Sequence, residues 1–304
     1  MEIVVRPGDT FWLYSQWFQI PLILIEDANP GILPEHLSIG QRVRIPGFRL
    51  TRYTLRSGEQ FGDVARRNRL PLEALSLVNP DLIPEEVREG QGIYVPVRIT
   101  YPIVHGQKEY DFSTLENDLQ QLAAIYPFMQ VEPIGSSVLG KPLYEIRLGR
   151  GVQVIHFNGS FHANEWITTP VLMQILNTFL LSLTNQDRIR GVETLSLYQN
   201  NTLSIVPMVN PDGVDLVIHG PPPERREEVL AINGWSQDFS NWKANIRGVD
   251  LNNQFPANWE IEKARKEPKR PAPRDYPGDA PLSEPEVNAM AKLAQERQFA
   301  RLFA

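Results

Sequence analysis

The chain contains no cysteine and only five histidines in 304 residues. The absence of thiols excludes disulfide bonds, thiolate metal ligands and cysteine nucleophiles together. It leaves the cellular compartment open, because a chain without cysteine is compatible with reducing and oxidising surroundings alike.

An excess of basic residues is also lacking, since the formal net charge is -6 and the sequence pI is about 5.5. Nucleic-acid binding proteins need concentrated lysine and arginine to neutralise phosphates, so a nucleic-acid partner is not expected. The apolar share of 42% is enough for a buried core, and the length suits about two domains.

Long hydrophobic runs are missing as well. The most apolar stretch, Leu172–Leu183, is short and is interrupted by Gln174 and Asn177, so no membrane span is expected. The first residues include Glu2 and Arg6 in place of a basic start followed by an unbroken apolar core, so no signal peptide is expected. Cytoplasmic and spore or cell-wall locations therefore both stay open.

An internal repeat dominates the first hundred residues: residues 3–46 recur at 53–96 with a constant offset of 50. The matching pairs are Gly8 with Gly58, Asn29-Pro30 with Asn79-Pro80, Gly40-Gln41 with Gly90-Gln91, and Pro46 with Pro96. The pattern of each repeat predicts a strand, two helical segments and a closing strand. The predicted strands are Ile3–Val5, Val43–Ile45, Tyr53–Leu55 and Ile93–Val95.

With its glycine turn, midway Asn-Pro and late Gly-Gln, each repeat resembles the LysM family, at residues 1–48 and 51–98. The resemblance implies binding of glycans that contain N-acetylglucosamine, such as peptidoglycan or muropeptides. A duplicated structural module without a ligand is the alternative. The pair is almost neutral, so recognition would depend on shape and hydrogen bonds to sugar. Glu59-Gln60 departs from Asp9-Thr10, and we expect the second site to be the weaker one.

An alternating α/β pattern follows, over residues 105–304. Ser113 and Glu116 predict a capping box that opens a helix to Ile125. The next predicted elements are strands at Gln130–Ile134, Leu143–Leu148, Val152–Asn158 and Thr202–Val209, and a helix at Glu165–Leu183. This order predicts an α/β fold with a mixed or mainly parallel sheet sandwiched between helices.

The later segments give weaker signals. Val171, Ile175 and Phe179 follow helical spacing and are predicted to face the core. The charges of Lys263–Lys269 have both signs and predict a solvated face, beside an exposed proline-rich connection. The phrase Ser283-Glu284-Pro285-Glu286 predicts a second capping box, at the start of the last helix.

The strongest chemical phrase is Asn158–Trp166, where a predicted strand ends and a helix begins. Within it, His162 and Glu165 are three residues apart, so an imidazole nitrogen and a carboxylate can point at one Zn²⁺ ion. The alternative is a capping glutamate beside a surface histidine, because this spacing alone is common.

Three further phrases follow in order: Asn210–Gly213 after a strand, then Trp242–Pro256, then Ser283–Glu286. The ordered set resembles the zinc carboxypeptidase family, the carboxypeptidase-A-like metallopeptidases, over residues 105–304. The resemblance implies a zinc-dependent peptidase with His162 and Glu165 as the first two metal ligands.

It also implies roles for residues around the metal. Asp250 matches the carboxylate that holds the metal-binding histidine from behind. Lys243 stands where the family usually has an arginine that polarises the scissile carbonyl. Asn252, Asn253 and Arg247 are assigned to substrate binding. The family's carboxylate clamp is Asn-Arg, so Asn253 is a departure that makes strict exopeptidase selectivity unexpected.

The same phrases, with two LysM units in front, resemble the γ-D-glutamyl-L-diamino-acid endopeptidase I branch of the family. That branch cleaves the bond between γ-D-glutamate and diaminopimelate or lysine in peptidoglycan stem peptides. Two alternatives stay open: a general metallocarboxypeptidase of the same fold, and a non-catalytic LysM wall-binding protein.

The resemblance places a third zinc ligand, a histidine, after the last predicted helix, and no histidine follows His219. The remaining candidates, His36, His105, His156 and His219, do not fit the role by their positions. Catalytic zinc takes three protein ligands. The expectation is therefore a C-terminally truncated peptidase domain that binds zinc poorly and does not hydrolyse peptides as it stands.

Overall fold

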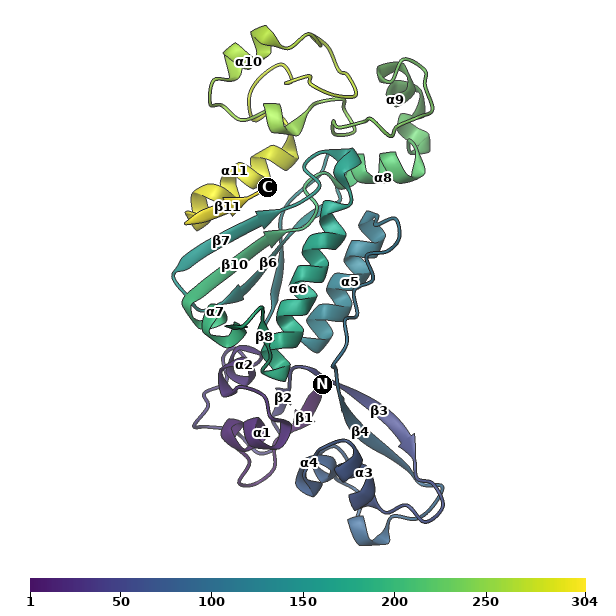
Figure 1. Cartoon of the computed structure of the whole chain (residues 1–304), viewed down its shortest axis with the longest axis vertical. Helices are drawn as coiled ribbons and strands as arrows, with labels where there is room; N and C mark the ends of the chain where they lie inside the picture. Colours follow the sequence, from purple (N-terminus) through teal and green to yellow (C-terminus); the bar gives the residue numbers. More distant parts are fainter. The chain divides into compact units, whose positions relative to one another are not determined.

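The computed structural model describes all residues 1–304 (Figure 1). Its packing divides the chain into two compact units. Unit 1 consists of Met1–Ile103, Gln120–Met129 and Asn177–Leu195; unit 2 consists of Val104–Leu119, Gln130–Leu176 and Ser196–Ala304. The domain limits expected from the sequence, 1–48, 51–98 and 105–304, stay a prediction.

Unit 1 contains the two repeats, and each forms the predicted βααβ module. The first consists of β1 (Glu2–Val4), α1 (Phe11–Phe18), α2 (Leu22–Asp27) and β2 (Arg42–Arg44). The second consists of β3 (Phe48–Thr54), α3 (Phe61–Arg67), α4 (Leu72–Leu77), the 3₁₀ turn η1 (Pro84–Glu86) and β4 (Gly92–Arg98). In each module the two strands pair antiparallel.

The repeated asparagine explains why both modules close in the same way. The Nδ2 atom of Asn29 donates to the carbonyls of Ile25 (2.7 Å) and Arg44 (2.8 Å), and its Oδ1 atom accepts from Arg44 N (2.7 Å). Asn79 makes the equivalent three bonds to Leu75 and Tyr94. Each buried amide thus joins the second helix of its module to the closing strand, and this satisfies polar groups that would otherwise be buried unpaired.

The departure at Glu59 preserves the turn in which it lies. In the first module the carboxylate of Asp9 accepts from Arg6 N (2.8 Å) and from a tyrosine hydroxyl (2.9 Å). In the second, the Glu59 carboxylate accepts from Arg56 N (3.1 Å) and from the Tyr53 hydroxyl (2.7 Å). The longer side chain therefore performs the same structural role in the second module.

The modules are continuous in unit 1 with the end of a long helix, α6 (Thr168–Asn185). The guanidinium of Arg98 donates to the carbonyl of Thr184 (2.9 Å) and to that of Phe18, and it lies 4.7 Å above the Phe48 ring. Burial lowers the pKa of Arg98. One arginine thus satisfies a carbonyl in the last turn of α6 and one at the end of α1.

Replacing Arg98 by methionine is expected to lower the free energy of unfolding by about 1–3 kcal/mol, because two carbonyls lose a charged donor while remaining partly buried. Urea denaturation monitored by circular dichroism measures the change. Arg88→Met, at an exposed position, is the matched control and should shift stability by less than about 0.5 kcal/mol. Equal effects of the two substitutions would contradict the role of Arg98.

Unit 2 is built on a five-stranded mixed sheet with the order β11-β7-β10-β6-β5. The strands are β5 (Gln130–Ser136), β6 (Pro142–Gly149), β7 (Gln153–Asn158), β10 (Asn201–Val206) and β11 (Arg301–Phe303). β7 runs parallel to β10 and β11, whereas β6 is antiparallel to both of its neighbours. The short pair β8 (Arg188–Ile189) and β9 (Val192–Glu193) forms a separate hairpin in unit 1.

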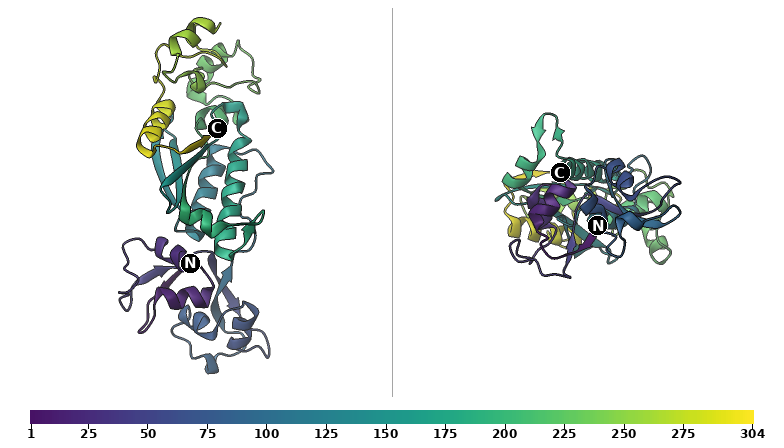
Figure 2. Two further views of the ribbon diagram at one scale, coloured as in Figure 1. Left: turned by 60° about the vertical axis from the view of Figure 1, so that its left-hand side comes forward. Right: turned by 90° about the horizontal axis from the view of Figure 1, so that it is seen from below.

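Helices cover both faces of this sheet, which confirms the predicted fold class. Figure 2 shows the strands between α11 on one side and α5 and α6 on the other. The helices and 3₁₀ turns are α5 (Phe112–Ile125), η2 (Ala163–Glu165), α7 (Thr194–Asn200), α8 (Pro211–His219), η3 (Pro223–Arg225), α9 (Arg226–Ile232), η4 (Leu251–Asn253), α10 (Trp259–Arg265) and α11 (Pro285–Arg297). Val287, Met290 and Leu293 of α11 pack in one apolar cluster with Leu143 and Val206 of the sheet.

Both predicted capping boxes were wrong, although both helices exist. Helix α5 is capped by Asp111, whose Oδ1 atom accepts from Thr114 N (2.8 Å), and Glu116 accepts from a tyrosine hydroxyl instead (2.9 Å). Helix α11 has Glu284 at its N-cap without a capping side-chain bond, and the Ser283 hydroxyl donates to Gln254 (3.0 Å). In α5 the neighbouring Asp111 takes the capping position and accepts from the Ser113 hydroxyl (3.1 Å), whereas in α11 the tertiary partner Gln254 accepts from the Ser283 hydroxyl.

The predicted buried face of α6 was also wrong in part. Phe179 is buried, but Val171 is 49% and Ile175 is 59% exposed. The residues that face the core are Met173, Leu176, Leu180 and Leu183. Because apolar residues lie on two faces of this helix, periodicity alone could not select the buried one.

By length and composition, the segment Ala163–Asn185 could span a bilayer, with 23 residues and a hydropathy of 1.4. It is longer than the apolar stretch recognised in the sequence. More than half of its apolar window (56%) is buried inside the protein, as in the core helix of a globular domain. Burial of this segment against the rest of the protein thus accounts for its apolar composition.

Candidate metal centre

The candidate metal ligands lie directly after strand β7. The chain turns at Ser160, whose φ is 47°, and His162 precedes the single turn η2, which ends at Glu165. This turn brings His162 Nδ1 to 3.0 Å from Glu165 Oε1. The backbone N–H groups of Ala163 and Asn164 donate to the carbonyls of residues 243 and 242, both at 3.1 Å, so the two segments are fixed side by side.

Asp250 lies on the other side of the imidazole. Its Oδ1 atom is 3.4 Å from His162 Nε2, and its Oδ2 atom accepts from Asp275 N (3.1 Å). The contact with Asp250 is the main cause that raises the pKa of His162. Burial opposes ionisation of Asp250, yet the hydrogen bond and charge of His162 lower the pKa of Asp250 overall. Asp250 is thus an ionised carboxylate that holds the ring of His162 in place.

Lys243 completes the group of side chains that the structure brings together. Its Nζ atom is 3.5 Å from Glu165 Oε1, and a quarter of its side chain is exposed. His162, Glu165, Lys243 and Asp250, separated by up to 88 positions in the sequence, therefore form one cluster of contacting side chains. The ammonium group of Lys243 lies beside a histidine and a glutamate, residues of types that bind metals. It can stabilise negative charge that develops on a substrate oxygen.

The predicted substrate-binding residues divide into two places. Asn252 and Asn253, in the turn η4 that Asp250 caps, line a pocket of about 390 Å³. Arg247 does not line this pocket. Its guanidinium lies 3.4 Å from Oε2 of the buried Glu284, in a partly buried ion pair.

The donor atoms of His162 and Glu165 fit part of a zinc site. An imidazole nitrogen and a carboxylate oxygen are ordinary zinc ligands, and a carboxylate behind the other ring nitrogen is the usual means of fixing a ligating histidine. Carboxylates face both ring nitrogens and raise the pKa of His162, so this position favours a positive charge at or beside the ring. The residues thus fit two of the three protein ligands of a catalytic zinc ion.

The 304 residues contain no group of three or more histidine, cysteine, aspartate or glutamate side chains placed to hold a metal ion. His156 is fully buried, as its position in a strand predicted, and bonds Ser204 at 2.9 Å. His219 lies 2.9 Å from Asp111 Oδ2. Neither histidine joins His162.

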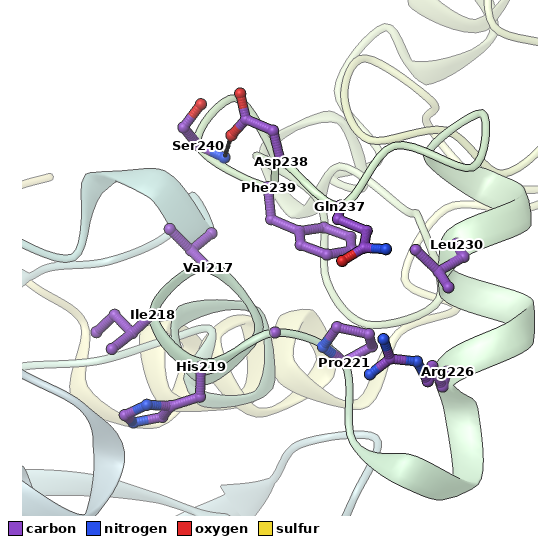
Figure 3. A pocket seen from close by; sticks show the side chains of 11 residues that line it. Val217, Ile218, His219, Pro221, Arg226, Leu230, Gln237, Asp238, Phe239 and Ser240 are labelled. Atoms are coloured by element: carbon purple, nitrogen blue, oxygen red, sulfur yellow. Dashed lines mark hydrogen bonds between the residues drawn. The ribbon is translucent and has the colours of Figure 1, made fainter.

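A second pocket, of about 420 Å³, lies at the end of α8 and was not predicted from the sequence (Figure 3). His219, Pro221 and Arg226 line it together with Phe239. Phe239 contacts the Trp242 ring edge-on at 5.8 Å, so this pocket borders the segment that leads into Lys243. None of the predicted site residues lines it.

Family comparisons agree with this geometry. The model of the zinc carboxypeptidase family matches residues 115–304, and that of the LysM domain matches residues 3–46. The chain belongs to the zinc carboxypeptidase family. The resemblance inferred from the ordered motifs is thereby confirmed, and so is zinc as the metal that the family uses.

Two relatives extend this result. The chain is 55% identical to γ-D-glutamyl-L-diamino acid endopeptidase 1 of Lysinibacillus sphaericus over 306 aligned residues, which cover 100% of this chain and 77% of that protein. It is 45% identical to the uncharacterized protein YqgT of Bacillus subtilis (strain 168), over 66% of this chain and 54% of that one. The similarity of this zinc carboxypeptidase-family chain to the endopeptidase thus extends over its whole length.

Solved structures support the fold. The crystal structure of thrombin activatable fibrinolysis inhibitor superposes with a TM-score of 0.52 at 16% identity, over 84% of this chain and 69% of that one. At that identity the match shows the carboxypeptidase-like fold alone.

The charged side chains that line the pocket of Asn252 and Asn253 were not predicted from the sequence. Besides the two asparagines, its lining includes Glu262, Arg265 and Lys266. The run Lys263–Lys269, which contains Arg265 and Lys266, was interpreted as a solvated face, yet the Lys266 side chain is only 21% exposed. No local motif signals this, because the run reaches the pocket through a tertiary contact of Lys266 with Asp275.

Proposed function

We propose that this protein is a zinc peptidase of bacterial cell-wall peptides that hydrolyses the bond between γ-D-glutamate and a diamino acid. The observation that carries the proposal is the cluster of His162, Glu165, Asp250 and Lys243, in a chain that is 55% identical throughout to an endopeptidase of that specificity.

The geometry gives each residue of the cluster a role. His162 and Glu165 would hold the metal, through Nδ1 and the carboxylate. Asp250 accepts the Nε2 proton of His162, which leaves Nδ1 free to bind the metal and fixes the plane of the ring. Bound zinc supplies Lewis-acid polarisation of the amide carbonyl and lowers the pKa of water.

Lys243 would act directly on the substrate. Its ammonium group lies beside Glu165, and its side chain is a quarter exposed, so it would donate to the carbonyl oxygen of the peptide bond that is cleaved. As negative charge grows on that oxygen during attack, the attraction to the ammonium increases and lowers the barrier. Lysine supplies this charge without the two parallel donors of an arginine.

The LysM modules would tether the enzyme to its substrate. The family model covers the first module, and the second has the same buried asparagine bonds and the same turn chemistry. We propose that both bind glycan containing N-acetylglucosamine in peptidoglycan or muropeptides. Binding of the glycan raises the local concentration of stem peptides around the peptidase domain.

We expect these 304 residues to bind zinc less tightly than a site with three protein ligands does. Two converging ligands hold catalytic zinc less tightly than three, so we propose that this chain alone binds zinc weakly and hydrolyses slowly or not at all. The similarity to the endopeptidase supports the peptidase function itself.

The test compares this chain with any longer product that its gene encodes. Zinc binding is measured by equilibrium dialysis, and cleavage is measured with a γ-D-glutamyl-diaminopimelate peptide. One bound zinc and cleavage by the complete product support the proposal. An inert complete product that carries zinc would refute the peptidase function and leave a wall-binding protein.

The second candidate function is a general metallocarboxypeptidase. It requires recognition of a terminal carboxylate, for which Asn253 offers an uncharged amide. Cleavage of ordinary peptides with a free C-terminus, and none after C-terminal amidation, would favour this function over the endopeptidase.

A further inference from the structure

The pocket beside η4 has an unusual lining for a surface hollow in an acidic protein. It lies between η4 and α10 and has a volume of about 390 Å³. Two side-chain amides, of Asn252 and Asn253, contribute donors and acceptors, and Trp259 and Phe255 contribute apolar surface. Charged side chains of α10 and of the residue after it complete the lining, so the pocket suits a polar ligand of limited size.

The charged side chains favour an anion. Arg265 and Lys266 are cationic and Glu262 is anionic, so the lining has a net positive charge in a chain whose net charge is -6. The Arg265 guanidinium contacts Glu262 Oε2 at 2.5 Å, but the Arg265 side chain is 66% exposed. Such a solvent-exposed ion pair is weak and can be exchanged for a ligand carboxylate.

Lys266 is the more firmly positioned of the two cations. Its Nζ atom lies 2.8 Å from Asp275 Oδ1, and its side chain is 21% exposed. Asp275 also contacts Arg274 at 3.2 Å, so its charge is shared between two cations. The ammonium of Lys266 therefore keeps capacity for a second anionic partner, because it has three donors.

A single aspartate connects this pocket to the candidate metal centre. Asp250 faces His162 Nε2 through Oδ1, and the same oxygen accepts from Asn252 N (3.2 Å). Its other oxygen accepts from Asp275 N (3.1 Å), and Asp275 in turn holds Lys266. The side chain that orients the metal-binding histidine therefore also fixes the amide wall and the cationic wall of the pocket.

We propose that Arg265 and Lys266 form, with Asn252 and Asn253, a subsite that binds a carboxylate of the peptide substrate next to the bond that is cleaved. The amides donate hydrogen bonds, and the two cations supply the charge that the amides lack. This inference rests on the proposed peptidase function, because it assigns Arg265 and Lys266 as specificity residues of that reaction.

The kinetic test uses the zinc-loaded full-length protein and a γ-D-glutamyl peptide whose diamino acid has free carboxylates. Lys266→Met and Arg265→Met should each raise KM about tenfold with little change in kcat, because one charge-assisted bond is lost in ground and transition state alike. Lys266→Arg keeps the charge and should stay within about threefold of wild type. For the same peptide with its diamino-acid carboxylates amidated, wild type and both methionine variants should have equal KM values.

Lys292→Met is the matched control, since Lys292 lies on α11 with a 72% exposed side chain and does not line the pocket. It should leave KM unchanged. Wild-type KM values in both methionine variants would overturn the inference.

A second readout does not depend on catalysis. Isothermal titration of free meso-diaminopimelate into the zinc-free 304-residue chain should show binding that weakens about tenfold in Lys266→Met. Such binding without any hydrolysis by the zinc-loaded gene product would refute the peptidase function and keep the carboxylate subsite. Hydrolysis with equal binding in wild type and Lys266→Met would keep the peptidase function and overturn the subsite.

Discussion

Replacement of His162 by alanine is expected to remove zinc-dependent hydrolysis and to lower zinc affinity by more than about a hundredfold in the full-length protein. His162 contributes one ligand atom, and its ring is also the group that Asp250 orients. Zinc affinity is measured by competition with a chromophoric chelator, and hydrolysis with the γ-D-glutamyl peptide.

Asp250→Asn should give the intermediate result, a loss of about 10–100-fold in zinc affinity, because the histidine stays but its orientation and basicity are no longer supported. His36→Ala, at an exposed position in the first LysM module, is the matched control and should bind zinc like wild type. Unchanged zinc affinity in His162→Ala would show that the metal, and with it the proposed active site, lies elsewhere.

The elements of the fold were predictable wherever one interaction dominates. The repeat predicted the two βααβ modules, since glycine at turns with positive φ, as at Gly8 and Gly58, has no good substitute there. Strands β6, β7 and β10 follow from apolar segments that are buried in a sheet. The two capping boxes were predicted wrongly because Ser113 and Ser283 bond to other residues. Ser113 donates to the neighbouring Asp111, and Ser283 donates to the distant Gln254.

The candidate site was predictable for the part that lies in contiguous phrases. His162 and Glu165 are one turn apart, and Asp250 follows Lys243 in a single segment, so motif order suffices to propose them together. The pocket beside them was not predictable. Lys266 reaches it from an irregular, charged segment through Asp275, and a sequence contains no direct signal of such a contact.

Glu286→Gln is expected to stabilise the protein above neutral pH. Glu286 has no exposed surface, and its Oε1 atom accepts from Val138 N (3.1 Å). Burial, with the nearby charges of Asp212 and Glu284, raises the pKa of Glu286 to about 7 from a usual 4.5. At physiological pH the folded protein therefore either keeps a proton on this side chain or holds a buried charge.

The sign of the pH dependence follows from proton linkage. Between pH 4.5 and 7 the folded state binds this proton more tightly than the unfolded state, so the contribution of Glu286 is favourable below pH 4.5 and is lost as pH rises through 7. A shift of this size corresponds to on the order of 3 kcal/mol at pH 8.5. Glutamine keeps the acceptor for Val138, offers donors to the neighbouring carboxylates and carries no charge to bury.

Urea denaturation of wild type and Glu286→Gln at pH 5 and pH 8.5 measures the effect. Similar stabilities at pH 5, and a variant more stable by on the order of 3 kcal/mol at pH 8.5, are the expected results. Glu296→Gln, on the same helix with half of its side chain exposed, should show no such pH-dependent difference. If Glu286→Gln were equally or less stable than wild type at pH 8.5, Glu286 would have to be ionised at little cost in the folded state, through compensating contacts with Asn245 and the Val138 amide.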